Sequence, residues 1–158
     1  MEEKIIIFLS KFQNQIDLIE KIYLKIDQRS SLLAKQQITD FIIESTGYWI
    51  HNLYCAYEDL FVITSSFWEN NINFDGASHK QLLKMMTIEI EGIRPAMLGE
   101  ESFKYLDELR GFRHVFRHAY SYGLDDERVI FLLKRILKQK ENIFKDINNF
   151  IQIIKTNL

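Results

Sequence analysis

Apolar residues recur at alternating steps of four and three from the start of the chain. In the first segment they place one stripe on a single helical face, made of Ile5, Leu9, Phe12, Ile16, Ile19, Tyr23 and Ile26. A polar interval, Arg29-Ser30-Ser31, predicts the end of this helix. The same spacing then resumes and continues to about Asn70, with a stripe made of Ile38, Ile42, Trp49, Ala56, Leu60, Ile63 and Phe67. The first part of the chain therefore predicts two long amphipathic helices.

The rest of the chain predicts one short helix and two more long ones. Residues 70–76 form the clearest loop, and Ser78 is a suitable N-cap for a short helix that carries Leu82, Leu83 and Met86. The Arg94-Pro95 step ends or kinks the segment around it. A fourth helix is expected from about Glu100 to Gly123, since glycine favours the left-handed conformation that ends helices. Its inward face comprises Leu106, Leu109, Phe112, Phe116 and Ala119, and that of the fifth helix, after Asp125-Asp126-Glu127, comprises Val129, Leu133, Ile136, Ile143, Ile147, Phe150 and Ile154.

No segment shows the period of two that a half-buried β-strand requires. The short connections predict an all-α fold, an antiparallel up-and-down bundle of four long helices plus one short helix. One proline and six glycines leave no linker-like stretch, so residues 1–158 are expected to form a single domain. Gly47 lies inside the second helix, where it costs about 1 kcal/mol relative to alanine, and it predicts either a bend or a close contact between helices.

Composition excludes several classes of protein. Cys55 is the single cysteine, which excludes an internal disulfide and a cysteine-rich zinc site and makes a reducing cytoplasm the expected location. The acidic start, Met1-Glu2-Glu3, is unlike a signal peptide, and no run approaches the roughly 20 apolar residues of a membrane span. The formal net charge is −2. Any contact with nucleic acid therefore has to come from a local cationic patch.

Such a patch lies on the predicted fourth helix. Between Arg110 and Tyr120 the chain has no acidic residue and carries Arg110, Arg113, His114, Arg117 and His118. Histidine exchanges a proton near neutral pH, and arginine binds phosphate through a bidentate fork while it stays charged. Together they suffice to cleave RNA without a metal or another cofactor. A base can activate the 2′-hydroxyl while a guanidinium stabilises the charge that develops on the phosphorane.

Two other interpretations of this stretch stay open. It can be a solvated face whose charges only keep the helix soluble. His114 and His118, four positions apart, can also be a zinc pair, although no acidic residue adjoins them and His51 and His79 lie in separate segments.

The spacing of Arg113 and His118 raises a geometric difficulty. They are five positions apart, which is about 140° around a helix, so one isolated helix cannot aim both at the same atom. A second copy of the helix can supply the missing residue if two protomers pair across this face in a two-fold dimer. The spacing therefore predicts a homodimer with a composite cleft.

The motif Arg113-x4-His118-x-Tyr120 resembles the Arg-x4-His-x-Tyr signature of HEPN ribonuclease toxins of the HepT type. The resemblance extends to residues 48–60, the Arg94-Pro95 turn and residues 112–118, and with the final helix it covers most of the chain. It implies a HEPN-like helical bundle that is the toxin of a HEPN/MNT (type VII) toxin–antitoxin system. The implied activity is that of a metal-independent endoribonuclease that works in a dimer cleft, with transfer RNA as a candidate substrate.

The resemblance also implies roles for the residues of the patch. Arg113 would bind and stabilise the scissile phosphate, and His118 would act as general acid or base. His114 would orient these two residues or the RNA. Arg110 and Arg117 have no assigned family role and are expected only to contact the RNA backbone.

Tyr120 is the implied control point. Such toxins are typically encoded beside a minimal nucleotidyltransferase antitoxin, MntA, which attaches AMP to the motif tyrosine and so adds bulk and negative charge beside the arginines. Its offset of about 40° from Phe116 also places Tyr120 at the edge of the core, with its hydroxyl at the surface.

An alternative function is a catalytically silent HEPN module that binds a nucleotidyltransferase or a nucleotide through the same face. A further alternative is a substrate-binding partner of a nucleotidyltransferase. His51-Asn52 either lines the cleft or is an ordinary hydrogen-bonded part of the bundle.

Overall fold

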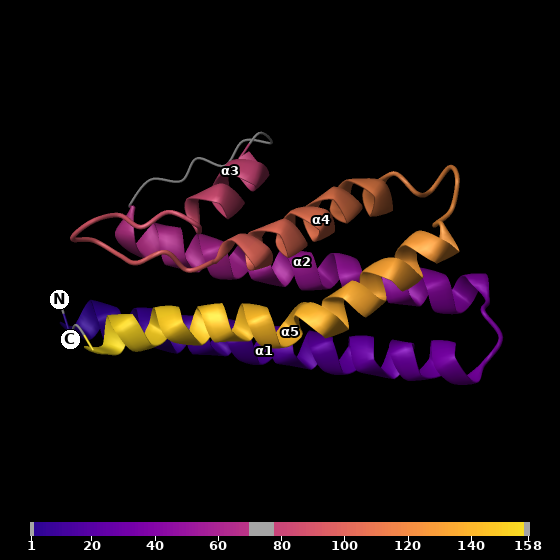
Figure 1. Ribbon diagram of the computed structural model, residues 1–158, viewed down its shortest axis with the longest axis horizontal. Coiled ribbons are helices and arrows are strands. Elements are labelled where there is room, and N and C mark those ends of the chain that lie inside the picture. The colour runs from indigo at the N-terminus through magenta and orange to yellow at the C-terminus, as the bar shows by residue number, and fades with distance from the viewer. Residues whose placement is uncertain (1, 70–77, 157–158) are drawn as a thin grey trace.

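The computed structural model describes residues 2–69 and 78–156, and every regular element in these ranges is a helix. The elements are α1 (Glu2–Lys35), α2 (Asp40–Trp68), α3 (Ser78–Met85), α4 (Glu100–Arg117) and α5 (Asp126–Thr156) (Figure 1). The prediction of an all-α bundle with four long helices and one short helix is confirmed. The predicted loop at 70–76 and the capping side chain of Ser78 lie outside the described part of the structure.

Helix α2 is the centre of the bundle, since it contacts each of the other helices. Figure 1 shows α1 and α2 running the length of the molecule, α5 lying along α1, and α4 crossing above α2. Helix α3 lies against both α2 and α4. Helices α3 and α4 therefore share one side of the bundle.

The first helix is longer than the sequence predicts. α1 continues through Arg29-Ser30-Ser31 to Lys35, and α2 begins after Thr39, whose Oγ1 accepts a hydrogen bond from the N–H of Ile42 at 3.4 Å. The predicted break is wrong because these polar residues are compatible with the helix: Arg29 Nε donates to Ser45 Oγ at 2.7 Å and so ties α1 to α2. Ile38 lies before α2 and is exposed, so it does not belong to the buried stripe.

The fourth helix, by contrast, is shorter than predicted. α4 ends at Arg117, and the N–H groups of His118 and Ala119 donate to carbonyls only three residues back, those of Val115 and Phe116. Gly123 has the predicted left-handed conformation, with φ +73°, but it closes a separate turn in which its N–H donates to the oxygen of Ala119 at 2.8 Å. The residues between α4 and Gly123 are therefore a turn, which changes the position of every side chain after Arg117.

A contact with α2 accompanies this early end of α4. A Cβ added at Gly47 would lie 2.5 Å from Cδ1 of Leu124, and close to the rings of Phe116 and Phe112. The absence of a side chain at Gly47 therefore lets the end of α4 and the following turn approach α2 closely. Of the two outcomes predicted for Gly47, the structure shows the close contact between elements.

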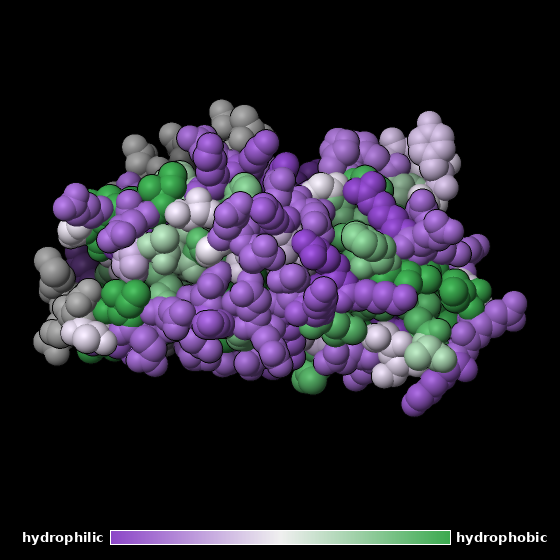
Figure 2. All heavy atoms as spheres, viewed as in Figure 1, coloured by the Kyte–Doolittle hydropathy of each residue, from purple (hydrophilic) through white to green (hydrophobic). Residues whose placement is uncertain are grey.

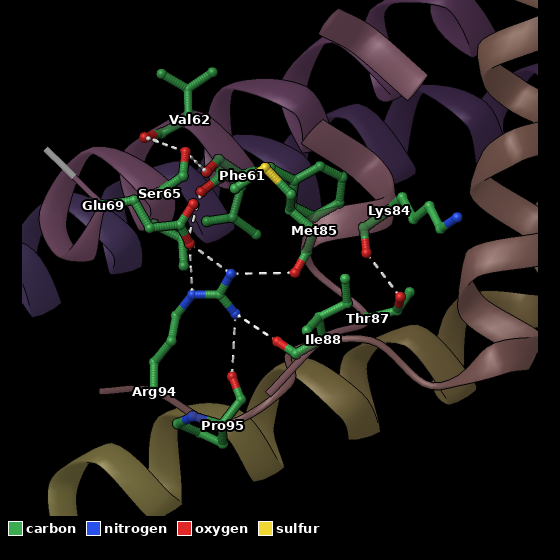
Figure 3. Close-up of polar contacts among 12 residues, drawn as sticks. Phe61, Val62, Ser65, Glu69, Lys84, Met85, Thr87, Ile88, Arg94 and Pro95 are labelled. Carbon is green, nitrogen blue, oxygen red and sulfur yellow. Dashed lines mark hydrogen bonds and ion pairs between the residues drawn. The ribbon is translucent and has the colours of Figure 1, made fainter. Parts of the chain in front are cut away.

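A buried ion pair holds the segment that follows α3. Arg94 Nε and Nη2 bond Oε1 of Glu69 at 2.9 and 2.6 Å, and the guanidinium also donates to the carbonyls of Met85, Ile88 and Pro95 (Figure 3). These bonds join the end of α2 to the end of α3 and to the turn beyond it. The Arg94-Pro95 step thus fixes where α3 lies.

Tyrosine hydroxyls link the helices inside the core. Tyr23 on α1 bonds Tyr57 on α2 at 2.7 Å and approaches Tyr105 on α4 at 3.4 Å. Burial raises the pKa of Tyr23 to about 12, against smaller opposing effects from its hydrogen bonds to Tyr105 and Tyr57.

At the start of α4, Asp146 on α5 accepts hydrogen bonds from the N–H of Gly99 and from the hydroxyl of Ser102, at 2.8 and 2.6 Å.

Exposed hydrophobic side chains occur at both ends of the bundle, with Ile6 and Ile153 near the termini and Phe41 near the start of α2. On the face in Figure 2, hydrophilic side chains cover the middle, and hydrophobic ones gather at the right-hand end, where α2 and α5 begin. Phe41, in the first turn of α2, and Phe131, in the second turn of α5, are both exposed. None of the helices in the described ranges combines the length and apolarity needed to cross a membrane.

Candidate functional site

The end of α4 and the start of α3 form the two walls of a groove of about 410 Å³. From the α4 side it is lined by Arg110, Arg113, His114, Arg117 and His118, which are the catalytic and RNA-binding candidates of the sequence. From α3 come His79 and Lys80. Within the described part of the chain, the lining consists of arginine, lysine and histidine alone, so the groove suits an anion.

Arg113 and His118 reach this groove within one chain, which corrects a premise of the sequence argument. The estimate of 140° assumed that both residues belong to the same helix, whereas His118 follows the last residue of α4 and has φ −106° and ψ 4°. The change of backbone direction after Arg117 brings His118 to the same groove as Arg113. The angle of 140° therefore no longer excludes a site within one chain, and the homodimer stays a prediction.

A hydrogen bond defines the chemistry of His118. Its Nδ1 lies 2.8 Å from the carbonyl oxygen of His114, and the two imidazole rings have centroids 4.4 Å apart. A carbonyl oxygen only accepts, so Nδ1 carries the hydrogen and Nε2 holds the lone pair in the neutral ring. The side chain is exposed. Nε2 of His118 is thus suited to accept a proton from a ligand in the groove.

Arg113 forms part of the floor of the groove, between α4 and α2. It is half-buried, and its Nε has no hydrogen-bond partner among the described residues. Nearby on α2, His51 Nδ1 and the hydroxyl of Tyr54 are buried and also have no partner in the described part. Burial and then the charge of Glu58 raise the pKa of Tyr54, so its hydroxyl stays protonated. The floor beneath Arg113 therefore contains several buried polar groups that have no partner among the described residues.

Cys55 and His51 belong to this floor. The Sγ of Cys55 lies 3.7 Å from Nε2 of His51, a pairing of thiol and imidazole that the sequence does not reveal. Burial nevertheless raises the pKa of the Cys55 thiol, and the interaction with Arg113 only partly opposes this. A thiol that resists ionisation is a poor nucleophile. Cys55 is therefore a small, partly buried side chain of the bundle.

His51 lies under the end of α4 and does not line the groove. Its ring stacks on Phe116 with centroids 4.9 Å apart and an interplanar angle of 20°. Burial lowers the pKa of His51, and the charges of Arg113 and Arg117 lower it further. Of the two predictions for this residue, the structure favours a part of the bundle.

The remaining residues of the patch differ in their hydrogen bonds and in their exposure to solvent. Arg110 Nε donates to Asp107 Oδ1 at 2.8 Å, which partly satisfies its guanidinium. His114 and Arg117 are exposed along the groove. Tyr120 lies outside the groove lining, two residues beyond His118, and is 87% exposed. The expectation that Tyr120 packs at the edge of the core is wrong, because it belongs to the turn after α4.

Sequence reasoning missed the second wall of the groove. His79 and Lys80 are separated from the motif by more than 30 residues of sequence, and only the packing of α3 against α4 brings them to it. His79 Nδ1 lies 2.8 Å from Oε2 of Glu58 on α2, an ion-pair distance whose angle falls outside hydrogen-bond geometry. No spacing rule links positions 58, 79 and 118. Their only sequence signal is the residue types themselves.

The zinc interpretation gains no support from the arrangement of ligands. Within residues 2–69 and 78–156, no group of three or more histidine, cysteine, aspartate or glutamate side chains is placed to hold a metal ion. The pair of His114 and His118 thus has no third protein ligand in the described ranges.

Comparisons with known proteins complete this description. Neither the search of curated proteins nor that of solved structures found a match. A family model described as HepT-like protein matches residues 45–154, which contain all of α3 and α4 and therefore both walls of the groove. This match covers well over half of the chain and agrees with the resemblance of the motif. The chain therefore belongs to the HepT-like family of HEPN-domain proteins.

Proposed function

We propose that this protein is the toxin of a HEPN/MNT toxin–antitoxin system and that it cleaves RNA in the groove between α3 and α4. The observation that carries the proposal is that Arg113 and His118, distant on an ideal helix, line one cationic groove. A phosphodiester is the anion that such a lining would bind, and imidazole with guanidinium is sufficient to cleave it. The family match supports the same activity.

In this proposal the residues of the groove divide the reaction between them. Nε2 of His118 removes the proton of the 2′-hydroxyl, and the resulting oxygen attacks the adjacent phosphorus. Arg113, whose side chain lines the groove, stabilises the negative charge of the phosphorane through its guanidinium. His114 orients His118 through its carbonyl oxygen and its ring. Arg110 and Arg117 bind the RNA backbone.

The working unit in the proposal is a homodimer, as the family resemblance implies. One chain already brings its own Arg113 and His118 to a groove. A second chain would extend the binding surface for RNA. Light scattering of the purified protein at micromolar concentration tests this part, and an active monomer would contradict it.

Control of the toxin is assigned to Tyr120. Its exposure leaves the hydroxyl accessible to an MntA-type nucleotidyltransferase, and its place two residues after His118 puts an added AMP near the groove. The phosphate of AMP would then compete with RNA for Arg113 and Arg117. Tyr122, which is 95% exposed in the same turn, offers a matched control. Co-expression with the antitoxin should protect cells from the wild type and from Tyr122→Phe, but not from Tyr120→Phe.

The decisive experiment is expression of the wild type beside His118→Ala. We expect growth arrest and fragmented RNA, examined first in the transfer RNA fraction, only with the wild type. The His118 side chain is exposed, so the purified variant should unfold at the same urea concentration as the wild type. Intact RNA and equal growth in both cultures would refute the ribonuclease and leave a binding module.

The independence from metal is tested on purified protein. Cleavage should be unchanged by EDTA, because the proposed steps use only imidazole and guanidinium groups. An activity that disappears with EDTA and returns with Mg²⁺ would overturn this mechanism.

A further inference from the structure

The groove presents imidazole groups from both of its walls. His118 belongs to the turn after α4, and His79 belongs to the first turn of α3. Cleavage of RNA by transfer to the 2′-oxygen moves two protons, one from the 2′-hydroxyl and one to the departing 5′-oxygen. A single base accounts for only the first transfer.

His79 is held in a defined position by a neighbouring helix. Its Nδ1 lies 2.8 Å from Oε2 of Glu58, and the Glu58 side chain is 15% exposed whereas that of His79 is 32% exposed. The carboxylate therefore meets the inner edge of the ring. Nε2, at the other edge, is the nitrogen left for the groove.

The fold also restricts the helix that carries His79. The residues after α3 are anchored by Arg94, which donates to the carbonyls of Met85 and Ile88 and is paired with Glu69 (Figure 3). Leu82 and Leu83 are buried in the core. Helix α3 is thus attached firmly enough to hold a side chain in register with α4, as proton transfer demands.

We propose that His79 is the second proton-transfer group of the groove and that Glu58 is its positioning residue. The inference rests on the proposed ribonuclease function. His118 takes the proton of the 2′-hydroxyl as the O2′–P bond forms. His79, protonated on both nitrogens, gives its Nε2 proton to the 5′-oxygen as the P–O5′ bond breaks. The products are a 2′,3′-cyclic phosphate and a 5′-hydroxyl, and exchange with water restores both imidazoles.

The test uses a leaving group that needs no proton. The cleavage site is first mapped with the wild-type protein. The same RNA is then made with sulfur in place of the 5′-bridging oxygen at that site. A thiolate can leave without being protonated, because a thiol is a far stronger acid than an alcohol. We expect His79→Gln to cleave ordinary RNA roughly 10²- to 10⁴-fold more slowly than the wild type, and the sulfur substrate within about tenfold of it.

Further variants separate this role from a structural one. His118→Gln lacks the base and should be slow on both substrates. Glu58→Gln should slow ordinary RNA and recover with sulfur, since it acts through His79. Gln81→Ala, an exposed residue of α3 outside the groove lining, should match the wild type on both. Urea unfolding of each variant checks the fold.

The outcomes distinguish the two proposals. His79→Gln that cleaves ordinary RNA at the wild-type rate, or that is equally slow on both substrates, overturns the role of His79 and leaves the ribonuclease standing. A wild-type protein that cleaves no RNA removes the proposed function and this inference together.

Discussion

Arg94 and Arg113 are both held between helices, and they differ in what their guanidinium groups meet. The side chain of Arg94 is fully buried and bonds one carboxylate and three carbonyl oxygens. Arg113 is half-buried beside the groove, and its Nε has no partner in the described part of the structure. A charge that is buried and satisfied stabilises an arrangement of the chain, whereas the guanidinium of Arg113 lines a groove and can meet a ligand there.

The surroundings of the two residues show the same contrast. Near Arg94 the polar atoms serve a turn and the ends of two helices (Figure 3), and among the described residues only Oε2 of Glu69 is buried there without a partner. Near Arg113, His51 Nδ1 and Tyr54 Oη are buried without hydrogen-bond partners among the described residues. Unsatisfied polar groups destabilise a folded protein, so their concentration at one place indicates a functional region.

The largest expected effect on stability is at Arg94. Arg94→Leu leaves Glu69 with a largely buried charge and no partner, which should lower the free energy of unfolding by about 3–5 kcal/mol. Urea unfolding followed by circular dichroism measures this loss. The double variant Arg94→Leu with Glu69→Leu should recover part of it, and a loss below about 1 kcal/mol in the single variant would show that the pair is not structural.

Substitution of Arg113 should affect RNA cleavage strongly and stability only slightly. Arg113→Gln is expected to lower RNA cleavage about 10²- to 10³-fold, because the charge on the phosphorane loses its donor. Its free energy of unfolding should change by less than about 1 kcal/mol, since no protein carboxylate loses a partner. Single-turnover cleavage and urea unfolding on the same preparation test both statements. A large loss of stability would place Arg113 in the class of Arg94.

A third arginine tests whether pairing alone explains the contrast. Arg135 on α5 binds Glu108 on α4 through two bonds of 3.0 and 3.1 Å, but the two side chains are 27% and 38% exposed. Arg135→Gln should lower the free energy of unfolding by only about 0–1 kcal/mol. A loss as large as that of Arg94→Leu would mean that burial does not decide the strength of these pairs.

The smallest expected effect concerns pH. The pKa of His51 is lowered in the folded state by burial and by Arg113 and Arg117, so the unfolded chain binds more protons as the pH falls through its ordinary value of about 6.5. This residue therefore favours folding above about pH 6.5 and opposes it progressively below. His51→Phe keeps a ring against Phe116 and removes the titration. The difference in urea midpoint between pH 7 and pH 5 should be smaller in the variant, and an unchanged difference would contradict the shift.

The sequence was sufficient to predict the parts of the molecule that follow a local period. The apolar stripes of the helices, the start of α4 near Glu100 and the left-handed Gly123 all depend on residues close in sequence. So does the grouping of arginines and histidines near the end of α4.

The errors have a common physical cause, which is tertiary contact. Arg29 continues α1 because Ser45 on another helix accepts its hydrogen bond. α4 ends at Arg117, where Phe116 and the Leu124 side chain of the following turn pack close to Gly47 on α2. His79 and Glu58 meet only because α3 folds back onto α2 and α4. None of these contacts has a signature in the period of the sequence.

The contact between Gly47 and Leu124 lets a residue of α2 influence the shape of the groove, although position 47 does not line it. The turn that carries His118 and Tyr120 is seated against α2 at a position where even one methyl group would overlap a neighbour. The overlapping atom is the tip of the Leu124 side chain, so a rotamer change can absorb alanine at position 47, whereas a larger side chain would press on the turn itself. Under the proposed function, variation at this one codon would alter the rate of RNA cleavage and the access of the antitoxin to Tyr120 at the same time.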